Sequence, residues 1–185
     1  MSFTVFMRAN WLNGVTAVLF VVAFWRIGIS PELPAVLAFI VGGALLAVID
    51  WKVQLLPRRI VYSTLAAVAG GLVFAAIVTG QWKSLGTAVL GAGLFSSAFF
   101  LIWLSTTHLT GRKMLGFGDV RLAAVLGLML GWYGLPFVLY GALVGHLFAL
   151  VIALAMSLRD RRVHVRYSFG PPLIAGALAV VMIAG

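Results

Sequence analysis

Two aspartates lie at the ends of apolar runs in an otherwise apolar chain. Asp50 ends the apolar run "GGALLAVID", and Asp119 follows the glycine-rich turn "GFG" and opens another apolar run. A carboxylate beside hydrocarbon is costly to bury, so such a residue needs a charged partner or a chemical task. Each aspartate has a basic neighbour in the sequence, Lys52 and Arg121 respectively. On composition alone, ion pairing at a helix end explains the pattern about as well as catalysis does.

Two carboxylates that face one another have a recognisable chemistry. In a poorly solvated site they share one proton, because two close negative charges repel each other. The ionised group then removes a proton from water, while the protonated group donates to the carbonyl oxygen of the peptide under attack. This hydrolysis requires no cofactor and no metal, and the nearby glycines would let a substrate backbone come close. The sequence does not distinguish the acid from the base.

The composition places most of the chain in a lipid bilayer. Of its 185 residues, 63% are hydrophobic and 9% are charged, and the mean hydropathy is +1.15. No soluble domain of this size has such a composition. The length suits a single membrane-embedded domain over residues 1–185. Because the chain has no cysteine and its three histidines are scattered, neither a disulfide nor a metal site is expected.

Apolar runs predict the helices that must position the two aspartates. They cover residues 11–26, 34–50, 60–80, 85–106, 120–131, 134–157 and 170–185. Most are long enough, or nearly so, to cross a hydrocarbon core of roughly 30 Å at about 1.5 Å per residue. The fifth is short, and the turn "GWYGLP" separates it from the sixth. We expect an all-α bundle of seven transmembrane helices, or six if the first run lies at the membrane interface.

Basic residues collect on one side of the predicted membrane. With a cytoplasmic N-terminus, the cytoplasmic segments hold eleven basic residues and the opposite side holds two, Arg26 and Lys83. This asymmetry sets the orientation of membrane proteins, and it accounts for a pI of about 11.2 without a nucleic-acid partner. The two aspartates then lie at the same cytoplasmic boundary, on different helices. The eleven residues are Arg8, Lys52, Arg58, Arg59, Arg112, Lys113, Arg121, Arg159, Arg161, Arg162 and Arg166.

Two further patterns concern helix packing. The spacing Gly-x-x-x-Gly occurs at Gly127/Gly131 and at Gly141/Gly145, and it favours close contact between helices. His146 lies within the sixth apolar run, where we expect it to form a hydrogen bond to another helix. The alternative is that it joins the two aspartates in a proton path, which would suit a proton-coupled transporter or channel component.

The chain contains the segments "KMLGFGDVRLAAVLGLMLGW", "IDWKVQLLPRR" and "SFGPPLIAGALA". Together they resemble the type IV prepilin peptidases, the Gly-x-Gly-Asp intramembrane aspartic proteases of prokaryotes. The segment "KMLGFGDVRLAAVLGLMLGW" is similar to the Gly-x-Gly-Asp signature of that family. The segment "IDWKVQLLPRR" is similar to the other catalytic segment, in which Leu-Pro follows an aspartate. The segment "SFGPPLIAGALA" resembles the Phe-Gly-Pro stretch before the last helix. The matching positions are Asp50, Pro57, Gly116, Gly118, Asp119, Gly170 and Pro171.

The resemblance implies both a function and a site. Members of this family remove the short basic leader of prepilins or pseudopilins at the cytoplasmic face of the prokaryotic cytoplasmic membrane. Asp50 and Asp119 would be the catalytic pair, and Gly116 and Gly118 would shape the loop around the second aspartate. Many members also carry a cysteine-rich insertion and methylate the new N-terminus, so this cysteine-free chain resembles a short, peptidase-only form. A catalytically silent assembly factor for pili or secretion would share these features and stays open.

Overall fold

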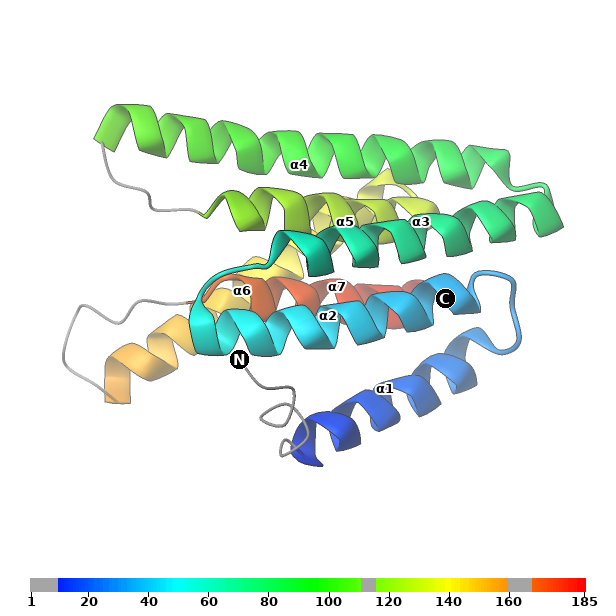
Figure 1. Ribbon diagram of the computed structural model, residues 1–185, viewed down its shortest axis with the longest axis horizontal. Helices are drawn as coiled ribbons and strands as arrows, with labels where there is room; N and C mark the ends of the chain where they lie inside the picture. The colour runs from blue at the N-terminus through cyan, green and yellow to red at the C-terminus, as the bar shows by residue number, and fades with distance from the viewer. Residues whose placement is uncertain (1–9, 111–115, 160–167) are drawn as a thin grey trace.

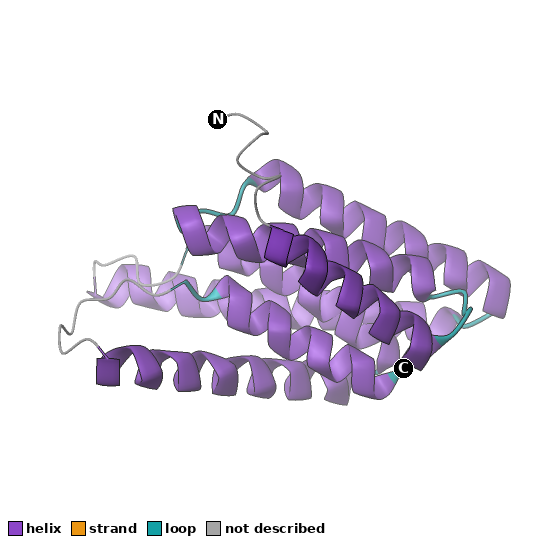
Figure 2. Ribbon diagram, turned by 90° about the horizontal axis from the view of Figure 1, so that it is seen from below, coloured by secondary structure: helices purple, strands orange, loops and turns teal. Residues whose placement is uncertain are grey.

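The computed structural model describes residues 10–110, 116–159 and 168–185, which form seven helices (Figure 1). These residues contain helices and loops and no strand (Figure 2). Each apolar run of the sequence coincides with one helix, so the prediction of an all-α bundle is confirmed. The helices are α1 (Asn10–Ile27), α2 (Leu33–Val53), α3 (Arg58–Thr79), α4 (Trp82–Thr110), α5 (Phe117–Tyr133), α6 (Leu135–Arg159) and α7 (Gly170–Ala184).

The helices differ in their capacity to cross a membrane. Among the described residues, α2, α3, α4 and α6 are long and apolar enough to span a bilayer. Helices α1 and α7 are apolar but shorter. Helix α5 has 17 residues and carries Asp119 and Arg121 near its start. The number of spanning helices and the side on which the N-terminus lies therefore stay predictions.

Helix α5 forms the centre of the bundle. Eleven of its 17 residues are buried, and it packs against α2, α3, α4, α6 and α7. A helix that is surrounded by protein needs apolar residues on every face rather than along one stripe. Because its neighbours and not lipid cover it, α5 is stable within the bundle even though its apolar run is short.

Small residues let the central helices approach one another closely. A Cβ atom added at Gly131 would lie 2.6 Å from the carbonyl oxygen of Thr87 in α4, and Gly127 meets the same helix one turn earlier. In α6, Gly141 lies against α5 and Gly145 lies against α7. The close helix contacts predicted from the two Gly-x-x-x-Gly pairs are therefore confirmed.

The predicted site segments lie at one end of the bundle. The C-terminal ends of α2, α4 and α6 and the N-terminal ends of α3, α5 and α7 gather there (Figure 1). Arg26 and Lys83 lie at the opposite end, as the charge pattern predicts. Six of the eleven basic residues expected on the cytoplasmic side lie outside the described residues, namely Arg8, Arg112, Lys113, Arg161, Arg162 and Arg166.

Candidate active site

Asp50 is buried in the last turn of α2, where the beginning of α7 holds its carboxylate. The side chain is 5% exposed. The hydroxyl of Ser168 donates a hydrogen bond to Oδ2 of Asp50 at 2.5 Å, and the backbone N–H of Gly170 donates to the same oxygen at 3.0 Å. A Cβ atom at Gly170 would lie 2.6 Å from this oxygen. Glycine at this position therefore lets α7 begin in direct contact with the carboxylate.

Asp119 is half-buried in the first turn of α5, where the preceding glycine turn fixes it. The backbone N–H of Gly116 donates to Oδ2 of Asp119 at 3.2 Å, and the N–H of Asp119 donates to the carbonyl oxygen of Gly116 at 3.0 Å. Because glycine has no side-chain oxygen, one half of a capping box is present, in which the Asp119 carboxylate accepts from the N–H of the N-cap residue. The positive end of the helix dipole lies beside the carboxylate, but the partial burial of the carboxylate opposes its ionisation.

Two packing contacts bring the aspartate-bearing segments together. Leu56, in the turn after α2, lies against the turn that carries the second aspartate, because a Cβ atom at Gly118 would be 2.8 Å from the Cβ of Leu56. Gly170 contacts the first carboxylate on one side and Leu122 of α5 on the other. The fold thus joins residues from α2, α5 and α7 in one site.

The basic residues that follow the two aspartates in the sequence, Lys52 and Arg121, form no described ion pair with them. The guanidinium of Arg121 lies over the ring of Phe117, 4.7 Å from its centroid, and near the ring of Tyr62 at 5.7 Å. Such cation–π contacts stabilise the arginine away from a carboxylate. Lys52 is exposed. Among the described residues, neither aspartate forms the ion pair that the helix-end explanation requires.

The other predicted site residues shape the helix starts. Pro57 directly precedes α3 with an extended backbone, at φ −64° and ψ 124°, and so ends the turn that carries Leu56. Pro171 occupies the first turn of α7. Proline is tolerated there because the first backbone N–H groups of a helix have no partner within the helix. Neither proline supplies a polar group to the carboxylates.

Ser168 is the site residue that sequence reasoning missed. It opens the quoted segment "SFGPP", but its hydroxyl had no assigned role. The signal was its position two residues before Gly170, at the entrance to a helix that begins in an otherwise apolar stretch. A hydroxyl at such a place requires a hydrogen-bond acceptor, and the buried carboxylate supplies one.

His146 is not joined to the aspartates. Its Nδ1 lies 2.7 Å from the carbonyl oxygen of Ala142, within its own helix α6. Its ring packs against Phe99 of α4 and Phe169 beside α7, with centroids 6.3 and 5.5 Å away. The predicted hydrogen bond to another helix is therefore wrong, because the nearest acceptor is the carbonyl one turn earlier. Contact between His146 and the neighbouring helices is aromatic instead.

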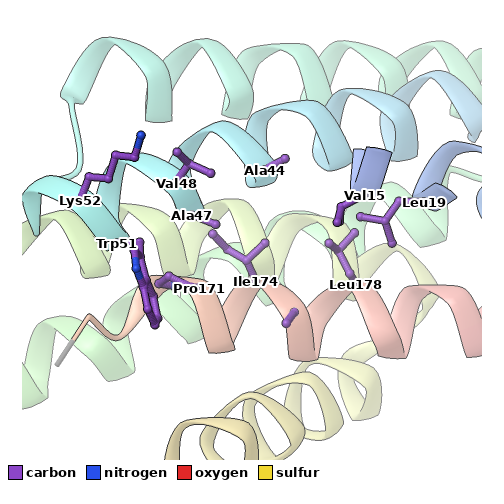
Figure 3. A pocket seen from close by; sticks show the side chains of 11 residues that line it. Val15, Leu19, Ala44, Ala47, Val48, Trp51, Lys52, Pro171, Ile174 and Leu178 are labelled. Carbon is purple, nitrogen blue, oxygen red and sulfur yellow. The ribbon is translucent and has the colours of Figure 1, made fainter. Parts of the chain in front are cut away.

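A groove lies between α1, α2 and α7, next to the segments that carry Asp50 and Gly170 (Figure 3). It encloses about 420 Å³, and its lining is apolar apart from Lys52. Trp51 and Pro171 line the groove, and each follows a residue of the site in the sequence. The groove offers apolar surface but no set of donors or acceptors for catalysis. In the described part of the chain, no three histidine, cysteine or acidic side chains form a metal-binding group either.

Comparison with known proteins bears on these segments. The sequence profile of the Type IV leader peptidase family matches residues 37–154, a range that includes both aspartates. The chain belongs to this family. No solved structure matches it.

Several curated relatives carry the name prepilin leader peptidase/N-methyltransferase. The protein of Pectobacterium carotovorum subsp. carotovorum is 38% identical over 140 residues, which cover 74% of this chain and 47% of the relative. That of Pseudomonas putida is 36% identical over 169 residues, 89% of this chain and 55% of the relative. That of Escherichia coli K12 is 32% identical over 179 residues, 91% of this chain and 73% of the relative. The chain thus spans about half the length of the first two.

Proposed function

We propose that this protein is an intramembrane aspartic endopeptidase that removes the basic leader of type IV prepilins or pseudopilins. Asp50 and Asp119 are its catalytic pair, and they act at the cytoplasmic face of the prokaryotic cytoplasmic membrane. The observation that supports the proposal is the position of Asp50 and Asp119 at one end of the bundle, where Gly170 lies against the carboxylate of Asp50 and against Leu122 of α5, and where neither aspartate has a described basic partner. Family membership and the names of the relatives support the same activity.

The geometry suits hydrolysis by a shared proton. One carboxylate is ionised and removes a proton from a water molecule as the water oxygen attacks the peptide carbonyl carbon. The other donates its proton to the carbonyl oxygen, which gives a neutral tetrahedral intermediate. The site lies at helix ends in a largely apolar bundle, so water competes weakly with these charges. Gly116 and Gly118 keep the turn before the second aspartate small, while Pro57, Gly170 and Pro171 set the starts of the neighbouring helices.

We propose leader cleavage without methylation, by one domain over residues 1–185. The relatives named above are called N-methyltransferases as well as peptidases. The sequence resemblance associates methylation with a cysteine-rich insertion, and this chain has no cysteine. A purified-component assay that measures methyl transfer to the cleaved prepilin tests this point directly, and methylated product would contradict it.

The transporter alternative finds less support. A proton path across a membrane places ionisable groups at successive depths. Here both aspartates lie at the same end of the bundle, and His146 bonds within its own helix. These positions favour chemistry at one membrane face over transport through the bilayer.

Co-expression with the prepilin encoded nearest its gene tests the proposed function. We expect the wild type to shorten the prepilin, and Asp50→Asn or Asp119→Asn to abolish processing while each variant still inserts into the membrane. The matched control is Glu32→Gln, which neutralises an acid that precedes α2 at the opposite end of the bundle and should leave processing unchanged. Cleavage by either aspartate variant would reject the catalytic pair. A wild type that inserts but never processes would instead support the silent assembly factor.

A further inference from the structure

The beginning of α7 does more than pack against Asp50, because it donates two hydrogen bonds to one carboxylate oxygen. The hydroxyl of Ser168 and the N–H of Gly170 both donate to Oδ2. Among the described residues, Oδ1 of the same carboxylate receives no hydrogen bond. Two protein donors therefore hold one oxygen of this carboxylate.

These two donors distinguish the members of the pair. Hydrogen bonds donated to a carboxylate stabilise its ionised form, and a bond to a charged group is stronger than a neutral one. Within residues 10–110, 116–159 and 168–185, Asp119 receives one hydrogen bond, from the N–H of Gly116 at the longer distance of 3.2 Å. When the pair holds one proton, the carboxylate with two short donors is the better place for the negative charge.

We propose, on the basis of the proposed function, that Ser168 is a positioning residue that holds Asp50 as the base of the pair, with Asp119 as the acid. In the first step a proton passes from water to Oδ1 of Asp50, the water oxygen bonds to the peptide carbon, and the proton of Asp119 passes to the carbonyl oxygen. In the second step the carbon–nitrogen bond breaks, the leaving amine takes the proton from Asp50, and Asp119 recovers its proton from a hydroxyl of the intermediate. The net reaction is hydrolysis, with both carboxylates returned to their starting state.

The surroundings of Asp50 make this hydroxyl a large part of its polar environment. The charged groups at the start of α5 are Asp119 and Arg121, and Arg121 lies over the ring of Phe117. From α7, Ser168 and Gly170 are uncharged donors. On α2 itself, Lys52 is exposed, and in the described part of the chain no basic side chain lies within ion-pair distance of the carboxylate. Removing the hydroxyl thus leaves one backbone N–H as the described donor.

The test compares Ser168→Ala and Ser168→Thr in the full chain, reconstituted in nanodiscs of phosphatidylethanolamine and phosphatidylglycerol with the purified prepilin. We expect Ser168→Ala to lower kcat about tenfold to a hundredfold, as for loss of one hydrogen bond to a charged group, with KM changed less than about twofold. Threonine retains the hydroxyl and should restore most of kcat. The control is Ser63→Ala, because this exposed serine of α3 bonds only to a backbone carbonyl of its own helix.

The pH–rate profile identifies the base. Because the hydroxyl stabilises the ionised carboxylate, Ser168→Ala should move the acidic limb toward neutral pH by about one unit, which corresponds to a tenfold change in equilibrium. The alkaline limb should stay in place. Movement of the alkaline limb would mean that Asp50 is the acid, and a kcat within about twofold of the wild type would remove Ser168 from the mechanism.

Failure of this inference differs from failure of the proposed function. The Asp50→Asn and Asp119→Asn variants are measured in the same nanodiscs. If both are inactive and Ser168→Ala is unaffected, the catalytic pair holds and the positioning role is wrong. If either aspartate variant still cleaves the prepilin, the proposed function is itself rejected.

Discussion

Replacing Gly170 by alanine tests how closely α7 holds the carboxylate of Asp50. The new Cβ atom would lie 2.6 Å from Oδ2 of Asp50 and 3.5 Å from Cδ2 of Leu122. The first distance is about 0.4 Å shorter than the 3.0 Å that Cβ atoms otherwise keep from their neighbours. Either the carboxylate turns away or the start of α7 moves, because the two cannot occupy the same space.

The cost of Gly170→Ala follows from these two responses. Overfilling a packed site destabilises a protein by about 1–3 kcal/mol. Separating the N–H of residue 170 from the charged oxygen loses a hydrogen bond of about 1.5–3 kcal/mol. If that bond also holds the carboxylate during hydrolysis, the rate of prepilin processing falls about 10- to 150-fold.

The assay measures the rate of prepilin shortening on a gel, and thermal unfolding of the same purified variant. Gly93→Ala is the matched control, since Gly93 lies exposed in α4 with nothing within 4 Å of an added Cβ atom. Its helix should gain up to about 1 kcal/mol from alanine, and processing should not change. Processing within about twofold of the wild type in Gly170→Ala would refute the contact between α7 and the carboxylate.

Three further outcomes are expected. Gly118→Val should abolish or strongly reduce processing while the protein still folds. The new Cβ atom would lie 2.8 Å from the Cβ of Leu56 and would push the turn before α5 away from α2. Normal processing would show that this contact does not position the two aspartates. Gly131→Leu should lower the unfolding temperature, since overpacking costs about 1–3 kcal/mol and the glycine lies against Ala88 of α4, whereas Gly86→Leu, with open space around it, should not. A chelator such as EDTA should leave processing unchanged, and a loss that zinc restores would replace the carboxylate pair with a metal mechanism.

The helices were predictable because a bilayer imposes a simple rule on sequence. Backbone groups in hydrocarbon must bond within their own helix, so long apolar runs become helices almost regardless of detail. The charge asymmetry and the alternating direction of successive helices then predicted that Asp50 and Asp119 lie at the same end of the bundle. The apolar run at 120–131 is short for a helix that must cross a bilayer. Helix α5 does not depend on that length, because other helices bury most of its residues.

Contacts between distant segments were not predictable from the same rule. Ser168 and Gly170 lie 118 and 120 residues beyond Asp50, and no periodicity links them. The error at His146 has a related cause. Helix α6 is apolar on most faces. Its sequence therefore does not show which polar side chain bonds to a neighbouring helix and which bonds to a backbone carbonyl of α6 itself.

The position of α5 also bears on how the chain enters a membrane. By itself, α5 combines 17 residues with an acidic and a basic side chain in its first turns, which makes it a poor candidate for independent transfer into lipid. Its neighbour α4 has 29 residues and approaches it closely at Gly91, Gly127 and Gly131. We therefore expect the two to leave the translocation machinery as a helical hairpin, with α4 shielding its partner until the remaining helices arrive.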